Sequence, residues 1–187
     1  MVYEEKTLKS EKIYEGHILN LRKDTVTVIN GESEREIVEH NGGAVIAAIK
    51  DDGKIVMVRQ YRKAAGRIML ELPAGKRDGR EDYLETAGRE LREETGYTAE
   101  NIRFITRMYT SPGYTEEVLY LYLASDLVPG DTDFDENEAI DIEEYPLDEA
   151  VAMVLSGEIE DGKTQTGILM AKAIIDREKS GENSRWK

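Results

Sequence analysis

Five glutamates stand close together in the segment 75–97, which reads GKRDGREDYLETAGRELREETGY. Glu90 and Glu94 are four residues apart with Glu93 between them, so a helix would bring these carboxylates together. Like charges at this spacing destabilise a helix by about 0.2–0.5 kcal/mol per pair. The negative end of the helix dipole adds roughly 0.3–1 kcal/mol for each glutamate. This crowding indicates that the folded protein brings a cation to the helix.

A hard divalent cation is one partner that such carboxylates can hold. Mg²⁺ takes oxygen ligands and substrate phosphates, and two such ions can orient a water molecule and neutralise a leaving phosphate. The alternative is a solvated acidic face, which accounts for most acidic helices and is favoured on the glutamates alone. Arg89 can pair with Glu93 and Glu85, each four residues away, whereas no residue of the helix is expected to pair with Glu90 and Glu94.

The residues around these glutamates predict where the helix begins and ends. Asp82 can cap its N-terminus, with Glu85 three residues later as the capping-box partner. Gly96 stands where a helix C-terminus favours a left-handed residue. The residues expected to face the core share one side of the helix: Leu84, Ala87, Leu91 and Thr95.

The composition excludes several kinds of partner and chemistry. Of 187 residues, 39 are acidic and 25 basic, which gives a formal net charge of −14. Because no basic face is available to neutralise phosphates, we expect neither nucleic acid nor an anionic membrane as a partner. The absence of cysteine excludes disulfides and cysteine-ligated zinc. No signal-peptide core is found at the N-terminus, and the longest apolar run, 44–49, is too short for a bilayer, so we expect a cytoplasmic protein.

Strands interleaved with a few helices predict an α/β layered core. Apolar residues among polar ones indicate strands before residue 41, and the sequence DDG at 51–53 predicts a hairpin turn between two later strands. A polar acidic loop is expected over 129–144. The strands expected after residue 41 cover 44–50, 54–62, 69–72, 102–109 and 118–124, and two further helices cover 147–155 and 164–177.

The spacing within the acidic segment resembles a known signature. Gly75, Glu81 and the run RELREETG at 89–96 fill the fixed positions of the Nudix box, which marks the Nudix hydrolase superfamily; Tyr97 fills the last, usually aliphatic, position. The resemblance implies an α/β Nudix fold, a mixed β-sheet sandwiched between helices, with a small N-terminal antiparallel β-sheet subdomain. It places this subdomain at 1–41 and the Nudix hydrolase domain at 42–187.

Further stretches resemble the ADP-ribose pyrophosphatase branch of this superfamily. They are QYR at 60–62, ELPAG at 71–75, TSPG at 110–113 and REIVEH at 35–40. A proline about fifteen residues past the box marks this branch, and Pro112 stands at that place. The resemblance implies Mg²⁺-dependent hydrolysis of ADP-ribose to AMP and ribose 5-phosphate, with Mn²⁺ as an alternative ion. Two other readings stay open: another nucleoside diphosphate sugar such as GDP-mannose as the substrate, and a module that binds ADP-ribose without cleaving it.

The resemblance also implies a set of metal ligands and a general base. The implied ligands are the backbone carbonyl of Ala74 and the carboxylates of Glu90, Glu93, Glu94 and Glu138. Arg89 would orient these carboxylates by charge-assisted hydrogen bonds. The base would come from a late mobile loop, where Glu136 and Glu138 are the candidates, because a carboxylate there approaches the water only when the substrate is bound. A solvated acidic turn is the alternative for this loop.

Substrate contacts follow from the same resemblance. The residues implied are Arg35, Glu36, Arg62, Ser111, Gly113 and Glu117. For Arg62 a structural salt bridge is an equally weighted alternative, and for the loop around Pro112 the alternative is a simple turn. The resemblance further implies a homodimer in which the N-terminal strands reach the partner's active site.

Overall fold

The structure, a computed structural model, describes residues 2–134 and 139–181 of the chain. It divides into two compact units, one of Met1–Gly42 with Tyr109–Val118 and the other of Gly43–Met108 with Leu119–Lys187. The segment 109–118, which we expected in the Nudix hydrolase domain, therefore belongs with the N-terminal strands. Each unit is described by itself below.

The first unit is built on an antiparallel sheet in the order β1-β2-β3. Its strands are β1 (Thr7–Glu15), β2 (Asn20–Val28) and β3 (Gly31–Glu39). Strand β3 also holds the segment 109–118, because the N–H of Val38 donates to the carbonyl of Tyr114 at 2.7 Å and the N–H of Glu116 donates to the carbonyl of Val38 at 3.0 Å. The small N-terminal antiparallel sheet is confirmed.

The second unit contains a mixed sheet in the strand order β10-β5-β4-β9-β8, with β6 beside β5 and β7 beside β4. Strand β4 runs parallel to β9 and antiparallel to β5 and β7. The elements of this unit are β4 (Gly43–Ile49), β5 (Lys54–Arg62), β6 (Arg67–Glu71), β7 (Ala74–Lys76), α1 (Tyr83–Thr95), β8 (Tyr97–Tyr109), β9 (Val118–Pro129), β10 (Ile140–Pro146), α2 (Leu147–Ser156) and α3 (Gly162–Lys179).

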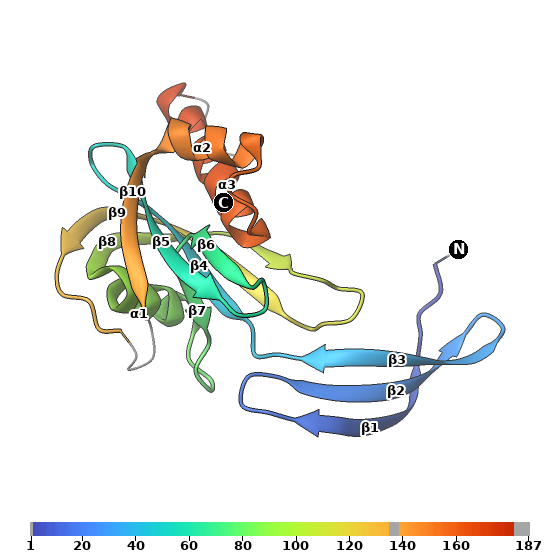
Figure 1. Ribbon diagram of the computed structural model, residues 1–187. Helices are drawn as coiled ribbons and strands as arrows, with labels where there is room; N and C mark the ends of the chain where they lie inside the picture. The colour runs from blue at the N-terminus through green and yellow to red at the C-terminus, as the bar shows by residue number, and fades with distance from the viewer. Residues whose placement is uncertain (1, 135–138, 182–187) are drawn as a thin grey trace. The chain divides into compact units, whose positions relative to one another are not determined.

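Helices cover both faces of this sheet, with α1 on one side and α2 and α3 on the other (Figure 1). On β4, Val45 and Ala47 pack into the core shared with α2 and α3, whereas Ala44 and Ile46 pack into the core shared with α1. A strand buried on both faces reads as a continuous apolar run, which explains the sequence of β4. The predicted sandwich of a mixed sheet between helices is confirmed. No helix in the described part of the chain is long and apolar enough to cross a membrane.

Strand β10 corrects the expected acidic loop, because residues 140–144 form a strand rather than a loop. It pairs with β5 along its length, from Ile140 opposite Gln60 onwards. Its acidic side chains meet cations: Glu143 accepts from Arg59 on β5 at 2.5 and 2.9 Å, and Glu144 accepts from Lys50, directly after β4, at 2.7 Å. Cross-strand ion pairs of this kind offset the low strand propensity of the acidic residues.

Candidate active site

Helix α1 begins and ends at the predicted residues. The side chain of Asp82 accepts the N–H of Leu84 at 2.9 Å, and Glu85 completes the capping box by accepting the N–H of Asp82. At the C-terminus Gly96 has a φ of 73°, the left-handed conformation that a helix end requires. With both ends fixed, the glutamates of the last two turns have defined positions.

The buried side of α1 differs from the expected one at Leu84, Thr86 and Glu94. Ala87, Leu91 and Thr95 are buried as predicted, but Leu84 is exposed. Thr86 is buried in the first turns instead. Its hydroxyl donates to Glu81 at 2.9 Å, so this buried polar group has a hydrogen-bond partner. The prediction for Leu84 is wrong since periodicity alone does not show where the sheet beneath the helix ends.

Glu94 joins α1 to β7. Its carboxylate is buried at 4% exposure, and Oε2 accepts the N–H of Ala74 at 3.0 Å. The carbonyl of the preceding residue, Pro73, accepts the N–H of Ile46 on β4 at 2.9 Å. The peptide between Pro73 and Ala74 is therefore held by α1 and β4, directly before the Ala74 carbonyl that is an implied metal ligand.

Glu90 rests on a glycine. A methyl group added to Gly75 would overlap the carboxylate of Glu90, so this side chain occupies space that only glycine leaves open. Gly43 on β4 approaches Gly75 as closely, since a methyl group there would overlap the carbonyl of Gly75. Gly75 is thus explained by the room that the side chain of Glu90 takes, and Gly43 by the close packing of β4 against β7.

Arg89 is the cation among these carboxylates. Its Nη1 donates to Glu90 at 2.8 Å and to Glu93 at 2.9 Å, and its Nε and Nη2 donate to Glu81 at 3.1 Å each. The hydrogen bonds to Glu81 contribute most to raising the pKa of Arg89, and the charge and hydrogen bonds of Glu90 and Glu93 add to the shift. The expectation that no helix residue pairs with Glu90 is therefore wrong, because the neighbouring Arg89 reaches it; the expected contact with Glu93 is confirmed.

The oxygen donors of this helix fit a hard divalent cation in kind. Among the described residues, no three His, Asp or Glu side chains are gathered as a bound metal would gather them. The reason lies in the contacts above, since Arg89 lies between Glu81, Glu90 and Glu93 while Glu94 faces the N–H of Ala74. The donor set nevertheless consists only of carboxylate and carbonyl oxygens, which Mg²⁺ prefers. The guanidinium of Arg89 is the cation that lies among these carboxylates.

Arg62 has the structural salt bridge that was the alternative to a substrate contact. Its Nε and Nη2 donate to the buried carboxylate of Glu71 at 2.7 and 2.6 Å, and Nζ of Lys163 donates to the same carboxylate at 2.6 Å. Burial alone would raise the pKa of Glu71, but these cations outweigh burial and lower it. The side chain of Arg62 remains 40% exposed, so the salt bridge leaves it accessible to a ligand.

Sequence reasoning missed Lys163 and the residue after it, Thr164. The hydroxyl of Thr164 accepts the N–H of Leu72 at 2.9 Å, within the ELPAG segment. Both residues are about 90 positions away from their partners, and no local pattern connects them. The one local signal is Asp161, which caps α3 three residues before Thr164 and accepts the N–H of Thr164 at 3.0 Å.

Arg35 and Glu36 lie on β3 of the first unit. Arg35 donates to Glu5 through Nε at 2.9 Å and Nη2 at 2.6 Å, and through Nη1 to Ser33 at 3.0 Å. Glu36 is exposed on the same strand. The structure therefore shows Arg35 in an ion pair, and its role toward a substrate stays a prediction.

The loop around Pro112 is a turn in the first unit, as its alternative reading proposed. The N–H groups of Tyr114 and Thr115 both donate to the carbonyl of Ser111 at 3.1 Å. Gly113 lies in the turn and is exposed. Glu117 follows the turn, and its carboxylate lies 3.3 Å from Nδ1 of His40. These residues are brought together by one turn, and their substrate contacts stay predictions.

Glu136 and Glu138, the candidate bases, lie outside the described residues. The chain just before them is held at the end of α1, where the N–H of Asp133 donates to the carbonyl of Glu93 at 3.0 Å. Arg92 also donates to the Asp133 carboxylate at 3.4 Å. The described part of this acidic segment therefore lies next to the glutamates of the box.

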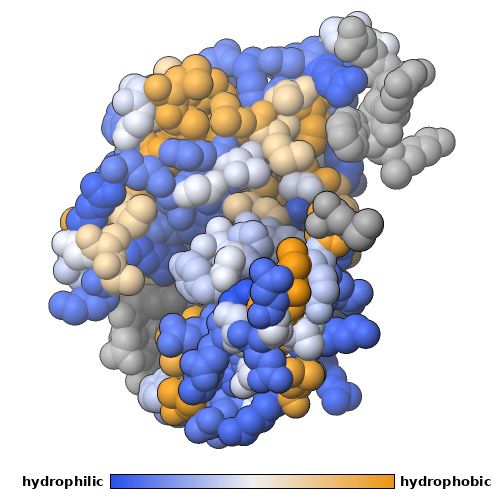
Figure 2. Space-filling model, turned by 90° about the vertical axis from the view of Figure 1, so that its right-hand side faces the viewer, coloured by the Kyte–Doolittle hydropathy of each residue, from blue (hydrophilic) through white to orange (hydrophobic). Residues whose placement is uncertain are grey.

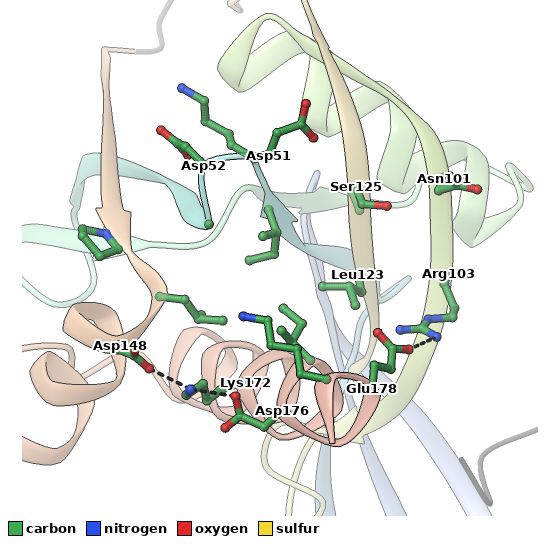
Figure 3. Close-up of a pocket in the computed structure, with 18 residues that line it drawn as sticks. Asp51, Asp52, Asn101, Arg103, Leu123, Ser125, Asp148, Lys172, Asp176 and Glu178 are labelled. Atoms are coloured by element: carbon green, nitrogen blue, oxygen red, sulfur yellow. Dashed lines mark hydrogen bonds and ion pairs between the residues drawn. The ribbon is translucent and has the colours of Figure 1, made fainter. Parts of the chain in front are cut away.

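A cavity of about 710 Å³ lies elsewhere in the second unit and contains none of the predicted site residues. It is lined by the turn after β4, by β8 and β9, and by parts of α2 and α3 (Figure 3). Several of its charged side chains pair with one another: Lys172 lies between Asp148 and Asp176 at 2.8 and 2.7 Å, and Arg103 donates to Glu178 at 2.8 Å. None of the carboxylates of the acidic segment lines this cavity, so it is not the candidate active site.

Comparison with known proteins decides the family. The family model of the NUDIX domain matches residues 40–166, which is more than half of the chain. The chain belongs to the Nudix family. The matched segment contains the capped acidic helix, the glycine beneath Glu90 and the buried residues that hold them.

Curated relatives extend the likeness beyond the domain. The chain is 41% identical over 181 residues to the ADP-ribose pyrophosphatase of Bacillus subtilis, covering 94% of this chain and 98% of that protein. It is 43% identical to the methanol dehydrogenase activator of Bacillus methanolicus, covering 87% and 90%. It is 34% identical to the GDP-mannose pyrophosphatase of Salmonella typhimurium, covering 84% and 90%.

A solved structure supports the fold. The crystal structure of an ADP compounds hydrolase superimposes with a TM-score of 0.81, covering 95% of this chain and 97% of that one. The sequence identity is 18%, so this comparison concerns the fold alone.

Proposed function

We propose that this Nudix protein is a cytoplasmic enzyme that hydrolyses the diphosphate bond of ADP-ribose to AMP and ribose 5-phosphate with Mg²⁺ or Mn²⁺. The observation that carries this proposal is the complete set of box carboxylates at α1, with Glu90 packed against Gly75 and paired with Arg89 in a part-buried setting. The 41% identity to an ADP-ribose pyrophosphatase over nearly the whole of both chains supports ADP-ribose as the substrate.

The metal would be held by Glu90, Glu93, Glu94 and the carbonyl of Ala74. These groups are oxygen donors on two elements that the hydrogen bond between Glu94 and Ala74 joins. The ion supplies positive charge to the diphosphate oxygens and lowers the pKa of bound water. Arg89 orients Glu90 and Glu93 through the hydrogen bonds it already makes to both.

The remaining steps fall to residues of the chain itself. Arg62 would bind the diphosphate through the guanidinium edge that does not face Glu71, since phosphate accepts the forked donors of arginine well. Glu136 or Glu138 would take the proton of the attacking water while a phosphorus–oxygen bond of the diphosphate breaks. Arg35, Glu36, Ser111, Gly113 and Glu117 are proposed as further substrate contacts.

One assay tests the proposal. The protein is incubated with ADP-ribose, with GDP-mannose and with other diphosphate compounds, each with Mg²⁺ and with EDTA, and the products are identified by chromatography. We expect AMP and ribose 5-phosphate from ADP-ribose, only with metal. Preferred cleavage of GDP-mannose would favour the alternative that the Salmonella relative supports. Binding of ADP-ribose without cleavage would identify a non-catalytic module. If no compound is cleaved in a metal-dependent way, the proposed enzymatic activity is contradicted.

We also propose that the chain consists of an N-terminal β subdomain of residues 1–41 and a Nudix hydrolase domain of residues 42–187. We propose further that the protein is a homodimer in which this subdomain reaches the partner's active site. Every residue of β1 is exposed, including Leu8, Ile13 and Tyr14 at about half of their surface, and a small sheet with exposed apolar residues is stabilised by burial against a partner. Apolar and hydrophilic surface alternate on the face drawn in Figure 2. Light scattering should give twice the 21.2 kDa mass of one chain; a monomer rejects the dimer.

A further inference from the structure

A buried carboxylate in the second unit holds two cations. Glu71, at the end of β6, is 1% exposed and accepts two hydrogen bonds from Arg62 at the end of β5. It accepts a third from Nζ of Lys163, in the first turn of α3, at 2.6 Å. One buried carboxylate is neutralised by one cation, so one of the two is in surplus.

The nearby Asp161 contacts Lys163 but is also stabilised by other partners. Its Oδ2 lies 2.8 Å from Nζ of Lys163, but it also accepts the N–H of Thr164 at 3.0 Å and the Thr164 hydroxyl at 2.5 Å. As the N-cap of α3, this carboxylate is stabilised by the helix N–H groups and by the positive end of the helix dipole. Lys163 is therefore left to serve as the counter-ion of Glu71.

Arg62 is the surplus cation. Its side chain is 40% exposed, against 14% for Lys163. Its Nη1 makes no hydrogen bond with any residue that the structure describes, and its bonds to Glu71 use only one edge of the guanidinium. The hydrogen bonds that Arg62 donates to Glu71 are the main cause that raises the pKa of Arg62, and the charges of Glu94 and Asp161 add to it, which places the guanidinium in the field of the acidic helix.

We propose that Lys163 is a positioning residue for substrate binding: by neutralising Glu71, it leaves the guanidinium of Arg62 oriented by that carboxylate and yet available to an anionic diphosphate. The proposal rests on the proposed function, in which Arg62 contacts the substrate. Without Lys163, Arg62 is the sole counter-ion of the buried Glu71 carboxylate. Its positive charge is then neutralised by Glu71 and is less available to an anionic diphosphate.

The kinetic test separates binding from turnover. Lys163→Met should raise KM for ADP-ribose about tenfold, near the lower end of what one hydrogen bond to a charged group contributes, and should change kcat less than about twofold. Lys163→Arg should restore KM. The matched control is Lys172→Met on the same helix, because Lys172 also bridges two carboxylates, Asp148 and Asp176, and should change neither constant.

A double-mutant cycle tests the route through Glu71. In a Glu71→Gln background, Lys163→Met should have no further effect on KM, since the charge that Lys163 neutralises is gone. An equal rise of KM in both backgrounds would overturn the proposal. So would a fall of kcat with KM unchanged, because that result would place Lys163 in the chemical step or in folding alone.

A second measurement needs no substrate. Hydrogen exchange of the Arg62 Nε–H, followed by ¹⁵N NMR on the free protein, should slow several-fold in Lys163→Met, because Glu71 then holds Arg62 more strongly. An unchanged or faster exchange overturns the proposal. If the wild-type protein cleaves no diphosphate compound, the proposed function fails, while this exchange rate still decides what Lys163 does to Arg62.

Discussion

Gly75 and Glu90 pack so closely that the carboxylate of Glu90 lies where a Cβ of residue 75 would be. The contact connects β7, where the carbonyl of Ala74 is a proposed metal ligand, with the third turn of α1. A fixed glycine in the Nudix box is therefore explained here by the room that a ligating side chain needs.

Gly75→Ala should keep the fold and lose activity. The added methyl group displaces the Glu90 carboxylate, and a misplacement of about 1 Å can cost roughly 100-fold in rate, so kcat for ADP-ribose should fall by about that factor. Gly88→Ala on α1 is the control, because its methyl group meets only Ile102 at an ordinary 3.7 Å. Equal activity of Gly75→Ala and the wild type would show that Glu90 does not need this position.

Arg89→Met should destabilise the protein mainly when no metal is present. It leaves Glu81, Glu90 and Glu93 without their shared cation, at a cost of about 1–3 kcal/mol in the free energy of unfolding. Because a divalent ion replaces that charge, the loss measured by denaturant unfolding should be smaller in Mg²⁺ than in EDTA.

The control for this prediction is Arg103→Met, which removes an exposed ion pair with Glu178 and should cost less than about 1 kcal/mol in both buffers. A loss for Arg89→Met that is the same with and without metal would mean that no ion binds among these carboxylates.

The structure explains why the acidic helix was predictable and its surroundings only in part. The caps at Asp82 and Gly96 depend on neighbours within four residues, so their types and spacing determine them. The exposure of Leu84 and the strand over 140–146 depend on the position of the sheet and on the cations Lys50 and Arg59, which lie far away in the sequence.

The same distinction holds within the candidate site. The pairing of Glu90 with Arg89 was missed because helical spacing treats adjacent residues as turned apart, whereas a long arginine side chain bends back across the helix surface. The contact of Glu90 with Gly75 and that of Glu71 with Lys163 join separate elements, and no local pattern contains them.

Glu71 should make the stability of the protein depend on acid. Its pKa in the folded protein is lowered below the ordinary value of 4.5, despite burial, by Arg62 and Lys163. The stability it contributes is therefore present above about pH 4.5 and is lost as the pH falls through the lowered folded value. Glu71→Gln should flatten the fall in the free energy of unfolding below that pH.

The comparison for this prediction is Glu100→Gln, a change at an exposed residue of β8. Denaturant unfolding at a series of pH values gives the slopes for all three proteins. If Glu71→Gln and the wild type lose stability in parallel on acidification, the ion pairs of Glu71 do not control acid unfolding.

Glu136→Gln and Glu138→Gln test the assignment of the general base. Removing a base should lower kcat by at least about 100-fold, and the fold should survive because both residues lie in the predicted loop. Steady-state kinetics and circular dichroism measure the two effects, with Asp131→Asn in the same acidic segment as the control. Near wild-type turnover in both glutamine variants would remove these residues from the mechanism.

The most direct test of the account is a crystal structure of the protein with Mn²⁺ and a non-hydrolysable α,β-methylene analogue of ADP-ribose. The anomalous signal should show an ion about 2.1 Å from carboxylate oxygens of Glu90 and Glu94 and from the carbonyl of Ala74, with the diphosphate beside it. An analogue bound without any such ion, with Glu90 still paired to Arg89 and Glu94 to the N–H of Ala74, would contradict the account.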